Sequence, residues 1–516
     1  MLRRSLLTAS AALLAARVLP RLARADAPGD RQILHVLDRL AFGPTRSDVA
    51  HVRSIGVDRY IAEQLDPQRL PEPAALTQRL AALTTQNKDP VTLFVEYGPL
   101  RPVDGVKRTA DEQKARRQRA NIIAIEARWA RIWRALYSPR QLHEVMVDFW
   151  FNHFNIFAGK GLDHLWVGAY ENEAIRPNAL GRFQDLVLAT ARHPAMLFYL
   201  DNYQNTAPGF KTPDGRELGL NENYARELME LHTLGVDGGY SQDDVITLAR
   251  ILTGWSLPRP NVMPRDFTGF EFYPARHDTG SKRLLGHDFA TGGEAEGAAA
   301  LTMLSRRPAT ALHVSRQLVE YFVSDSAPPA LVERVSTRFQ QTDGDIRAVL
   351  QTLFTSAEFR GSAGGKYKSP YRYVLSAARA ARLEVNNPRP LLGAMAQQGQ
   401  PLYGCVTPDG FRDSEATWLS PDATLLRVGF ATALGAGKMP VGAVPVLEPG
   451  IVQVSAPATS APAPAPAQGA GEPVDAAALE ALLAPGLSSE TRTTIASAQP
   501  ELRAALLLGS PDFMRR

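Results

Sequence analysis

The stretch that decides the fold class spans residues 110–157 and reads ADEQKARRQRANIIAIEARWARIWRALYSPRQLHEVMVDFWFNHFNIF. Charged and apolar turns alternate along it with the period of an α-helix. Pro139 follows Ser138 and marks a break, because proline lacks an amide proton and clashes with the preceding helical turn. The stretch therefore predicts two long helices that are separated after residue 138.

Similar helical spacing of apolar residues recurs along most of the chain. Further helices are expected over residues 31–40, 179–192, 223–234, 242–253, 308–323, 330–341, 345–356 and 370–383. Strand-like alternation is scarce, and its best case is a hairpin that pairs Phe270–Tyr273 with Arg283–Leu285. We expect a mostly α fold, with one large multi-helix domain and one small β-hairpin.

Composition limits the class of protein. The chain has 516 residues, of which 45% are hydrophobic and 21% charged, a balance that is typical of a globular protein with a large core. A single cysteine, Cys405, excludes an intrachain disulfide framework. The formal net charge is +4, but residues 1–25 hold five arginines and no acid. The rest is near neutral, so no nucleic-acid partner is expected.

The N-terminus has the organisation of an export signal. Arg3-Arg4 precedes the apolar run Ser5–Ala16, and small residues end the segment at Ala25. Arg-Arg-Ser-Leu-Leu resembles a twin-arginine signal, although departures from the fuller pattern leave Sec export open. We expect residues 1–25 to be cleaved off near Ala25. The mature chain has no transmembrane segment, so the sequence predicts a soluble periplasmic or secreted protein.

The composition changes near the C-terminus. Residues 455–471 are nearly all Ala, Pro, Ser and Thr, which favours an extended linker over a packed core. The predicted organisation is a helical domain over 26–452, an Ala/Pro-rich disordered linker or insertion over 453–474, and a helical segment over 475–516. We expect that last segment to pack on the main domain.

The most informative polar segment is residues 221–236, NENYARELMELHTLGV. Its apolar residues share one face of a helix, and three polar residues form a stripe at the edge of that face: Asn223, Glu227 and Glu230. A carboxyl at such a boundary is partly desolvated, which raises its pKa toward the range useful to a general acid. Glu227 is therefore the candidate general acid or base.

The alternative interpretation of the same segment is a purely structural ladder of ion pairs. Glu222, Arg226 and Glu230 stand at four-residue steps, as in the ion ladders of solvated helices. If Arg226 neutralises Glu230, only Glu227 remains unusual. Glu227 and Glu230 are also candidate ligands for a divalent cation, although the sequence requires no cofactor. His232 lies about 200° around the helix from Glu230 and should face another part of the fold.

A second candidate segment is Phe149–Asn155. His153 follows apolar residues at four-residue steps, so it is either a hydrogen-bonded core histidine or a site residue. Asn152 and Asn155 either orient polar groups of a substrate or satisfy the backbone at a helix end.

A third candidate segment contains His277, Asp278 and Lys282. An Asp in a turn that ends at Gly280 bonds its own backbone, which alone explains the pattern. The alternative is that these three side chains complete a cleft.

Together these segments resemble the bacterial family known as domain of unknown function 1800. The similarity covers nearly the whole mature chain, and it departs mainly at the Ala/Pro-rich insertion and at Pro408–Phe411. The motifs that carry it are Arg39–Thr45, Phe149–Phe154, His193–Met196, Leu200-Asp201, Asn221–Gly235, Gly239-Tyr240, Asp244-Val245, Thr253–Trp255, His277-Asp278, Lys282, Leu285-Gly286, Lys368–Pro370 and Leu508–Phe513.

The resemblance implies an exported, largely helical protein but no established reaction. Members of that family are often encoded beside a second exported family that looks like relatives of alkaline phosphatases and sulfatases. The resemblance therefore points to such a neighbour as a candidate partner.

Two functions remain open. The first is a hydrolase or lyase that acts on an extracellular or cell-envelope polymer, with Glu227 as general acid or base and further catalytic candidates His153, His277 and Asp278. Its substrate-binding candidates are Asn152, Asn155, Asn221, Asn223, Arg226 and Lys282. The second is a non-catalytic envelope or partner-binding protein whose polar cluster is structural. Convergence of these side chains in one pocket would favour the enzyme.

Overall fold

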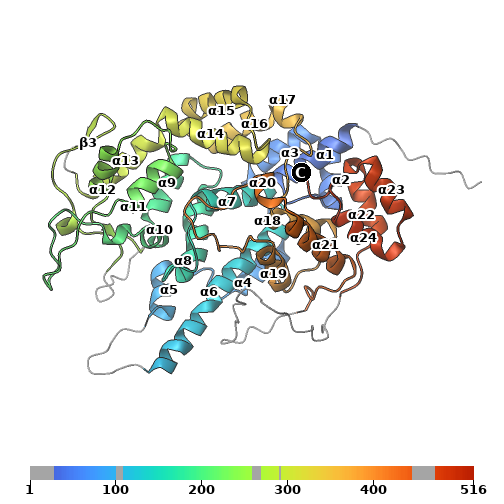
Figure 1. Ribbon diagram of the computed structural model, residues 1–516, viewed down its shortest axis with the longest axis horizontal. Coiled ribbons are helices and arrows are strands. Elements are labelled where there is room, and N and C mark those ends of the chain that lie inside the picture. The colour runs from blue at the N-terminus through green and yellow to red at the C-terminus, as the bar shows by residue number, and fades with distance from the viewer. Residues whose placement is uncertain (1–27, 100–108, 259–268, 290–291, 444–470) are drawn as a thin grey trace, which may run out of the picture.

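The computed structural model describes residues 28–99, 109–258, 269–289, 292–443 and 471–516 (Figure 1). Within them, 24 α-helices stand against two small two-stranded sheets, which confirms the mostly α fold class. None of the helices in these ranges is long and apolar enough to cross a membrane. The predicted export signal (1–25) and residues 453–470 of the predicted linker lie outside the described residues.

The two long helices expected at the centre of the chain form with a break at the predicted place. Helix α6 (Ala110–Tyr137) begins at a capping box, in which the Thr109 side chain accepts from the Glu112 amide and Glu112 caps Thr109 in return. Helix α7 (Gln141–His153) follows the Pro139 break. Helix α7 is buried along most of its length, whereas α6 is mostly exposed before Ala120 and enters the hydrophobic core from there on.

The remaining helices surround this pair. Before α6 the chain forms α1 (Pro28–Leu40), α2 (Arg46–Ile55), α3 (Val57–Gln64), α4 (Ala74–Ala81) and α5 (Pro90–Tyr97). After α7 it forms α8 (Asp163–Tyr170), α9 (Phe183–Arg192), α10 (Pro194–Tyr199), α11 (Asn223–Glu227), α12 (Gln242–Ile251), α13 (Glu294–Ser305), α14 (Pro308–Phe322), α15 (Pro329–Gln341) and α16 (Ile346–Phe354). The last third contains α17 (Ala357–Arg360), α18 (Pro370–Ala380), α19 (Arg389–Gln397), α20 (Glu415–Trp418), α21 (Pro421–Gly435), α22 (Ala476–Leu483), α23 (Ser489–Ser497) and α24 (Pro500–Leu508).

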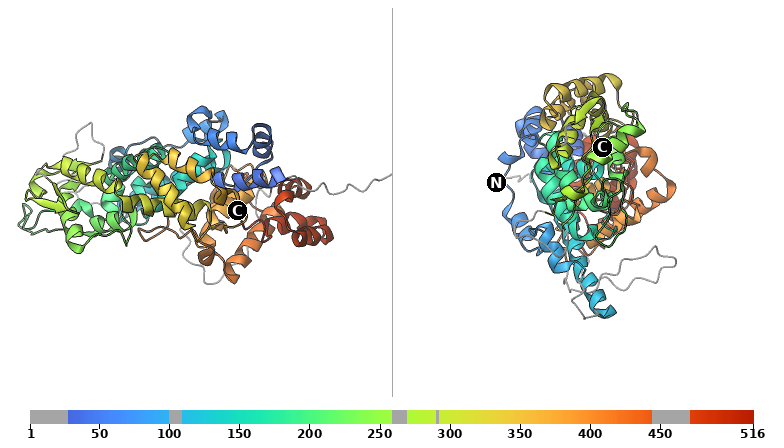
Figure 2. Two further views of the ribbon diagram at one scale, coloured as in Figure 1. Left: turned by 90° about the horizontal axis from the view of Figure 1, so that it is seen from above. Right: turned by 90° about the vertical axis from the view of Figure 1, so that its left-hand side faces the viewer.

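The molecule is elongated, and the first and last helices lie side by side at one end of it (Figures 1 and 2). Helix α1 contacts the short 3-10 turn Ala484–Gly486, and the Arg31 guanidinium donates to the Pro485 carbonyl at 3.1 Å. Helix α24 packs against α21. Helices α9 to α13 and the small sheets occupy the opposite end (Figure 1).

The expected hairpin does not form with the predicted partners. Strand β2 (Glu271–Phe272) pairs with β1 (Trp255–Ser256), and β3 (Lys282–Leu284) pairs with β4 (His287–Phe289). The second pairing follows from a tight turn in which Leu285 and Gly286 take φ values of 50° and 81°. A two-residue turn with two positive φ angles joins adjacent strands directly, so β3 returns onto the segment that follows it.

Candidate functional site

The helix expected over 223–234 changes type halfway. Helix α11 ends at Glu227, and residues Leu228–His232 continue it as one π-helical turn. The Thr233 hydroxyl donates to the Leu228 carbonyl at 2.6 Å, and Gly235 takes φ 81°, the left-handed conformation expected at the helix end. A π turn is wider than an α turn and is frequent at functional sites.

The ion ladder on this segment forms as the sequence indicates. The Arg226 guanidinium lies 3.0 Å from the Glu222 carboxylate and 3.7 Å from the Glu230 carboxylate. It also donates to the Gln242 side chain at 3.0 Å. Arg226, a predicted substrate-binding residue, therefore already neutralises two carboxylates of its own helix.

Glu227 stands apart from the ladder. Its carboxyl is half-buried and makes no hydrogen bond or ion pair with another described residue. Burial raises the pKa of Glu227, the charge of Glu230 raises it further, Arg226 opposes both, and the nearby Asp409 adds to the rise. A carboxyl that holds its proton longer than usual is suited to act as a general acid.

The two asparagines beside Glu227 hold the backbone in place. The Asn221 side-chain oxygen accepts from the Asn223 amide at 3.0 Å, and the Asn223 side chain donates to the Leu200 carbonyl at 3.2 Å. The Asn221 amide in turn donates to the Asn205 side chain at 2.9 Å. Both side chains fix the entry to the helix, so they are less free to bind a substrate.

Asn152 and Asn155 clamp one loop onto the end of α7. Asn152 forms a two-way pair with the Phe411 backbone, since its oxygen accepts from the amide at 2.8 Å and its nitrogen donates to the carbonyl at 2.9 Å. Asn155 donates to the carbonyls of Cys405 at 3.1 Å and Thr407 at 2.8 Å. These two residues therefore position the loop over residues 405–411.

His153 lies in a cluster of three imidazoles, in which His153 and His232 are buried and His313 is partly buried. Its ring centroid lies 6.0 Å from that of His232 and 6.3 Å from that of His313, and its Nε2 donates to the His232 carbonyl at 3.1 Å. Burial lowers the pKa of His153 to about 3, so the ring is neutral at neutral pH. His232 does face another part of the fold from Glu230, as expected from the helix geometry.

Asn152 and His153 line a polar hollow of about 370 Å³, which we call the acidic cleft. Helices α7 and α14 form its walls together with residues 400–418. Its carboxylates are Asp148, Glu320, Asp325, Asp409 and Asp413.

Two carboxyls of the acidic cleft have opposite pKa shifts. Burial raises the pKa of Glu320, against the attraction of Arg316 and Lys366. Burial alone would also raise the pKa of Asp413, but Arg516 and Lys366 hold it below its usual value. Carboxyls with separated pKa values in one hollow are typical of acid–base sites.

His277, Asp278 and Lys282 lie in a different network. His277 Nε2 and Lys282 Nζ lie 3.0 Å and 2.9 Å from the Glu296 carboxylate, and all three side chains are buried. Asp278 accepts two hydrogen bonds from the Arg250 guanidinium at 2.8 and 3.2 Å. These contacts join α12, β3 and α13, and none of these side chains lines the acidic cleft.

The structure thus brings only part of the predicted set together. Asn152 and His153 line the acidic cleft together with Asp409, and the charge of Asp409 raises the pKa of Glu227. The residues that line this cleft do not include Glu227, Asn221, Asn223, Arg226 or the group around His277. Asp409 and Glu320 were missed by the sequence reasoning. An Asp-Gly pair at 409–410 looks like an ordinary turn, and a single Glu on the apolar helix over 308–323 looks like its solvated face.

The sequence also offered Glu227 and Glu230 as candidate ligands for a divalent cation. In the described ranges, no group of three or more His, Cys, Asp or Glu side chains is placed to hold a metal ion. The predicted pair Glu227 and Glu230 is therefore not part of such a group.

The fold and the cleft define a large helical protein with a carboxylate-lined hollow. A family model described as protein of unknown function (DUF1800) matches residues 35–515. The chain belongs to this family, which confirms the resemblance seen in its motifs. No curated protein and no solved structure matches the chain.

Proposed function

We propose that the protein is an exported hydrolase or lyase that acts on an extracellular or cell-envelope polymer, with Glu227 as its general acid or base. The observation that carries the proposal is the unpaired, half-buried Glu227 carboxyl, whose pKa is raised by burial and by two neighbouring carboxylates. The arginine-rich segment over residues 1–25 supports export.

Asp409 supplies the second carboxylate that cleavage of a glycosidic bond requires. It is exposed on the loop that Asn152 and Asn155 clamp, and it lines the acidic cleft. In hydrolysis, Glu227 protonates the leaving oxygen while Asp409 removes a proton from the attacking water. In elimination, the Asp409 carboxylate removes a proton from the carbon next to a carbonyl group of the substrate, and Glu227 protonates the leaving group. Asp278 is paired with Arg250 and Asp201 with Lys160, so neither carboxylate is as free as Asp409 to act as the second catalytic carboxylate.

The test uses the mature protein on purified pectin, chitin, xylan and peptidoglycan. New reducing ends report hydrolysis, and the ultraviolet absorbance of an unsaturated product reports elimination. For a polymer that is turned over, Glu227→Gln should lower kcat by about 100-fold or more. Glu222→Gln is the matched control, because it changes the same helix without touching the proposed acid. Equal turnover by Glu227→Gln and the parent protein would remove Glu227 from the mechanism.

The alternative is a non-catalytic envelope or partner-binding protein, favoured by one observation. The side chains of Asn152, Asn155, Asn221 and Asn223 are all bonded to the backbone of their own fold. This alternative predicts that Glu227→Gln changes the melting temperature and no activity. It also predicts that an exported protein related to alkaline phosphatases and sulfatases co-purifies with the chain.

A further inference from the structure

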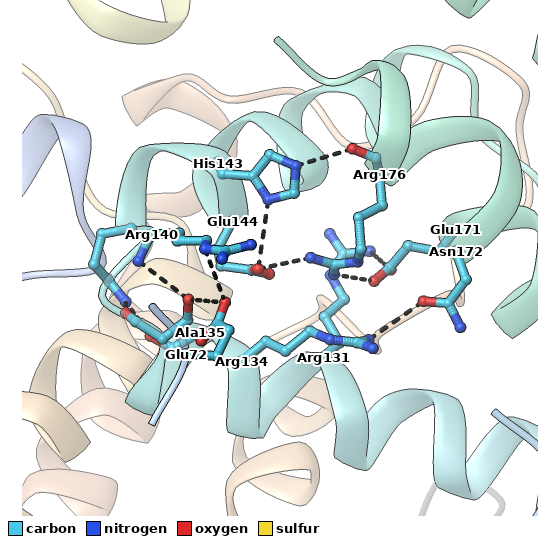
Figure 3. Close-up of polar contacts among 12 residues, drawn as sticks. Glu72, Arg131, Arg134, Ala135, Arg140, His143, Glu144, Glu171, Asn172 and Arg176 are labelled. Atoms are coloured by element: carbon cyan, nitrogen blue, oxygen red, sulfur yellow. Dashed lines mark hydrogen bonds and ion pairs between the residues drawn. The ribbon is translucent and has the colours of Figure 1, made fainter. Parts of the chain in front are cut away.

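A second hollow, which we call the arginine groove, lies between α6, α7, α16 and residues 67–81. Its volume is about 610 Å³, larger than that of the acidic cleft. Apart from His143, its charged lining among the described residues is four arginines and two glutamates: Arg134, Arg140, Arg176, Arg347, Glu72 and Glu144. All of them except Arg347 are labelled in Figure 3.

Both glutamates are already matched to an arginine. Glu144 lies 2.6 Å from Arg176, which also bonds the buried Glu171 at 2.8 Å (Figure 3). Glu72 lies 3.5 Å from Arg140. The two carboxylates of the lining are therefore paired with two of its four arginines, Arg140 and Arg176.

Arg134 has no such partner. Its guanidinium donates to the side-chain oxygen of Asn172 at 3.3 Å and forms no ion pair with a described residue. Asn172 is itself fixed, because its nitrogen donates to the Gln86 carbonyl at 3.2 Å. Burial lowers the pKa of Arg134 to about 10, and repulsion by Arg176 adds to the fall, against the attraction of Glu144 and Glu171. A partly buried cation without an ion pair of its own favours an additional opposite charge, since burying charge is costly.

Arg347 reaches the same groove from α16. It is exposed and forms no ion pair or hydrogen bond with a described residue. Two guanidinium groups without an ion pair to a described residue, from helices far apart in the sequence, thus line one hollow. Guanidinium groups recognise phosphate, sulfate and carboxylate through paired N–H donors.

We propose that the arginine groove is an anion-binding site that holds a phosphate, sulfate or carboxylate group through Arg134 and Arg347. The groove is larger than one oxyanion needs, so the anion is a substituent of a larger molecule. The side chains of Gln86 and Asn87 also line the groove and offer amide donors and acceptors to the uncharged part of that molecule. This site is separate from the proposed acid at Glu227.

The test is calorimetric titration of the mature protein with three probes: inorganic phosphate, inorganic sulfate and glucuronate. We expect saturable binding of at least one probe, which identifies the anion class, and weaker binding as salt is raised. Arg134→Gln should weaken that binding by about tenfold or more, because a charge-assisted contact is lost. Arg347→Gln should weaken it by a smaller factor, because the residue is more exposed.

Arg334→Gln is the matched control. Arg334 is an exposed arginine that pairs with Glu358 at 2.8 Å outside the groove, so its loss should leave binding unchanged. The bound probe should raise the melting temperature of the parent protein and not that of Arg134→Gln. If Arg134→Gln does not fold, Arg347→Gln decides the question. Absence of saturable binding by all three probes, or equal binding by parent and groove variants, would overturn the proposal.

Discussion

His193 makes the stability of this protein depend on pH. It is the N-cap of α10, where its Nδ1 accepts from the Ala195 amide at 3.2 Å, and only 5% of the residue is exposed. Burial lowers the pKa of His193 from 6.5 to about 3. The folded protein therefore keeps this ring neutral at a pH where the unfolded chain protonates it.

The magnitude follows from the two pKa values. Because the folded pKa is the lower one, the stabilisation is fully present above pH 6.5 and is lost as the pH falls toward 3. Each pKa unit corresponds to about 1.4 kcal/mol, so lowering the pH from 7 to 5 should cost about 2 kcal/mol through this residue. The same change should disturb the cap, since a protonated Nδ1 cannot accept a hydrogen bond.

The assay is urea unfolding of the parent protein and His193→Asn at pH 7, 6 and 5. Asparagine preserves a side-chain acceptor at the N-cap and removes the titration. We expect the parent protein to lose about 2 kcal/mol more than the variant over this range. Equal losses in the two proteins would refute the reasoning, because the buried imidazole would then not be the titrating group.

One neighbouring carboxyl must be controlled. Glu173 lies 3.9 Å from His193 Nε2, and burial raises its pKa to about 7. The effect of Glu173 on stability has the opposite sign, because its pKa is higher in the folded protein than the ordinary value of 4.5. Its contribution to the stability of the fold is fully present below pH 4.5 and is lost as the pH rises through 7. Glu173→Gln in both backgrounds removes this contribution, and the difference between the backgrounds should persist.

Two further predictions concern the scaffold around the sites. Asn152→Ala leaves the amide and carbonyl of Phe411 without their side-chain partner. The free energy of unfolding should therefore fall by about 1–3 kcal/mol in urea titrations. No change would mean that other contacts hold the loop. Glu296→Gln removes the carboxylate between His277 and Lys282 and leaves the buried lysine charge without its partner. The free energy of unfolding should then fall by about 3–5 kcal/mol, measured by thermal unfolding. A fully stable variant would show that Lys282 is neutral or solvated.

Local features of this fold could be predicted from local sequence. The helix break after Ser138, the left-handed Gly235 and the ladder centred on Arg226 each depend on residues within a few positions of one another. Proline geometry, glycine freedom and four-residue spacing determine them without reference to the rest of the chain. The π-helical turn after Glu227 was not foreseen, because it depends on how this segment packs.

The candidate site was only partly predictable for the same reason. The sequence singled out Glu227 because one helix face places it at the edge of the apolar stripe. Asp409, whose charge raises the pKa of Glu227, comes from a loop far along the chain. The sequence also grouped His277 with Glu227, although His277 is bound to Glu296 in a separate network. Motifs show which residues carry chemistry, whereas the long-range packing of helices decides which of them meet.

A single buried guanidinium lies between the acidic cleft and the arginine groove. Arg131 bonds Asp148, which lines the cleft, at 2.5 Å. It also bonds Glu171 at 3.1 Å, and Glu171 in turn bonds Arg176 of the groove (Figure 3). A ligand that moves Arg176 would change the electrostatic environment of Asp148, because Glu171 and Arg131 connect the two residues. Thermodynamic linkage then requires that occupancy of either hollow alters the affinity of the other by the same factor.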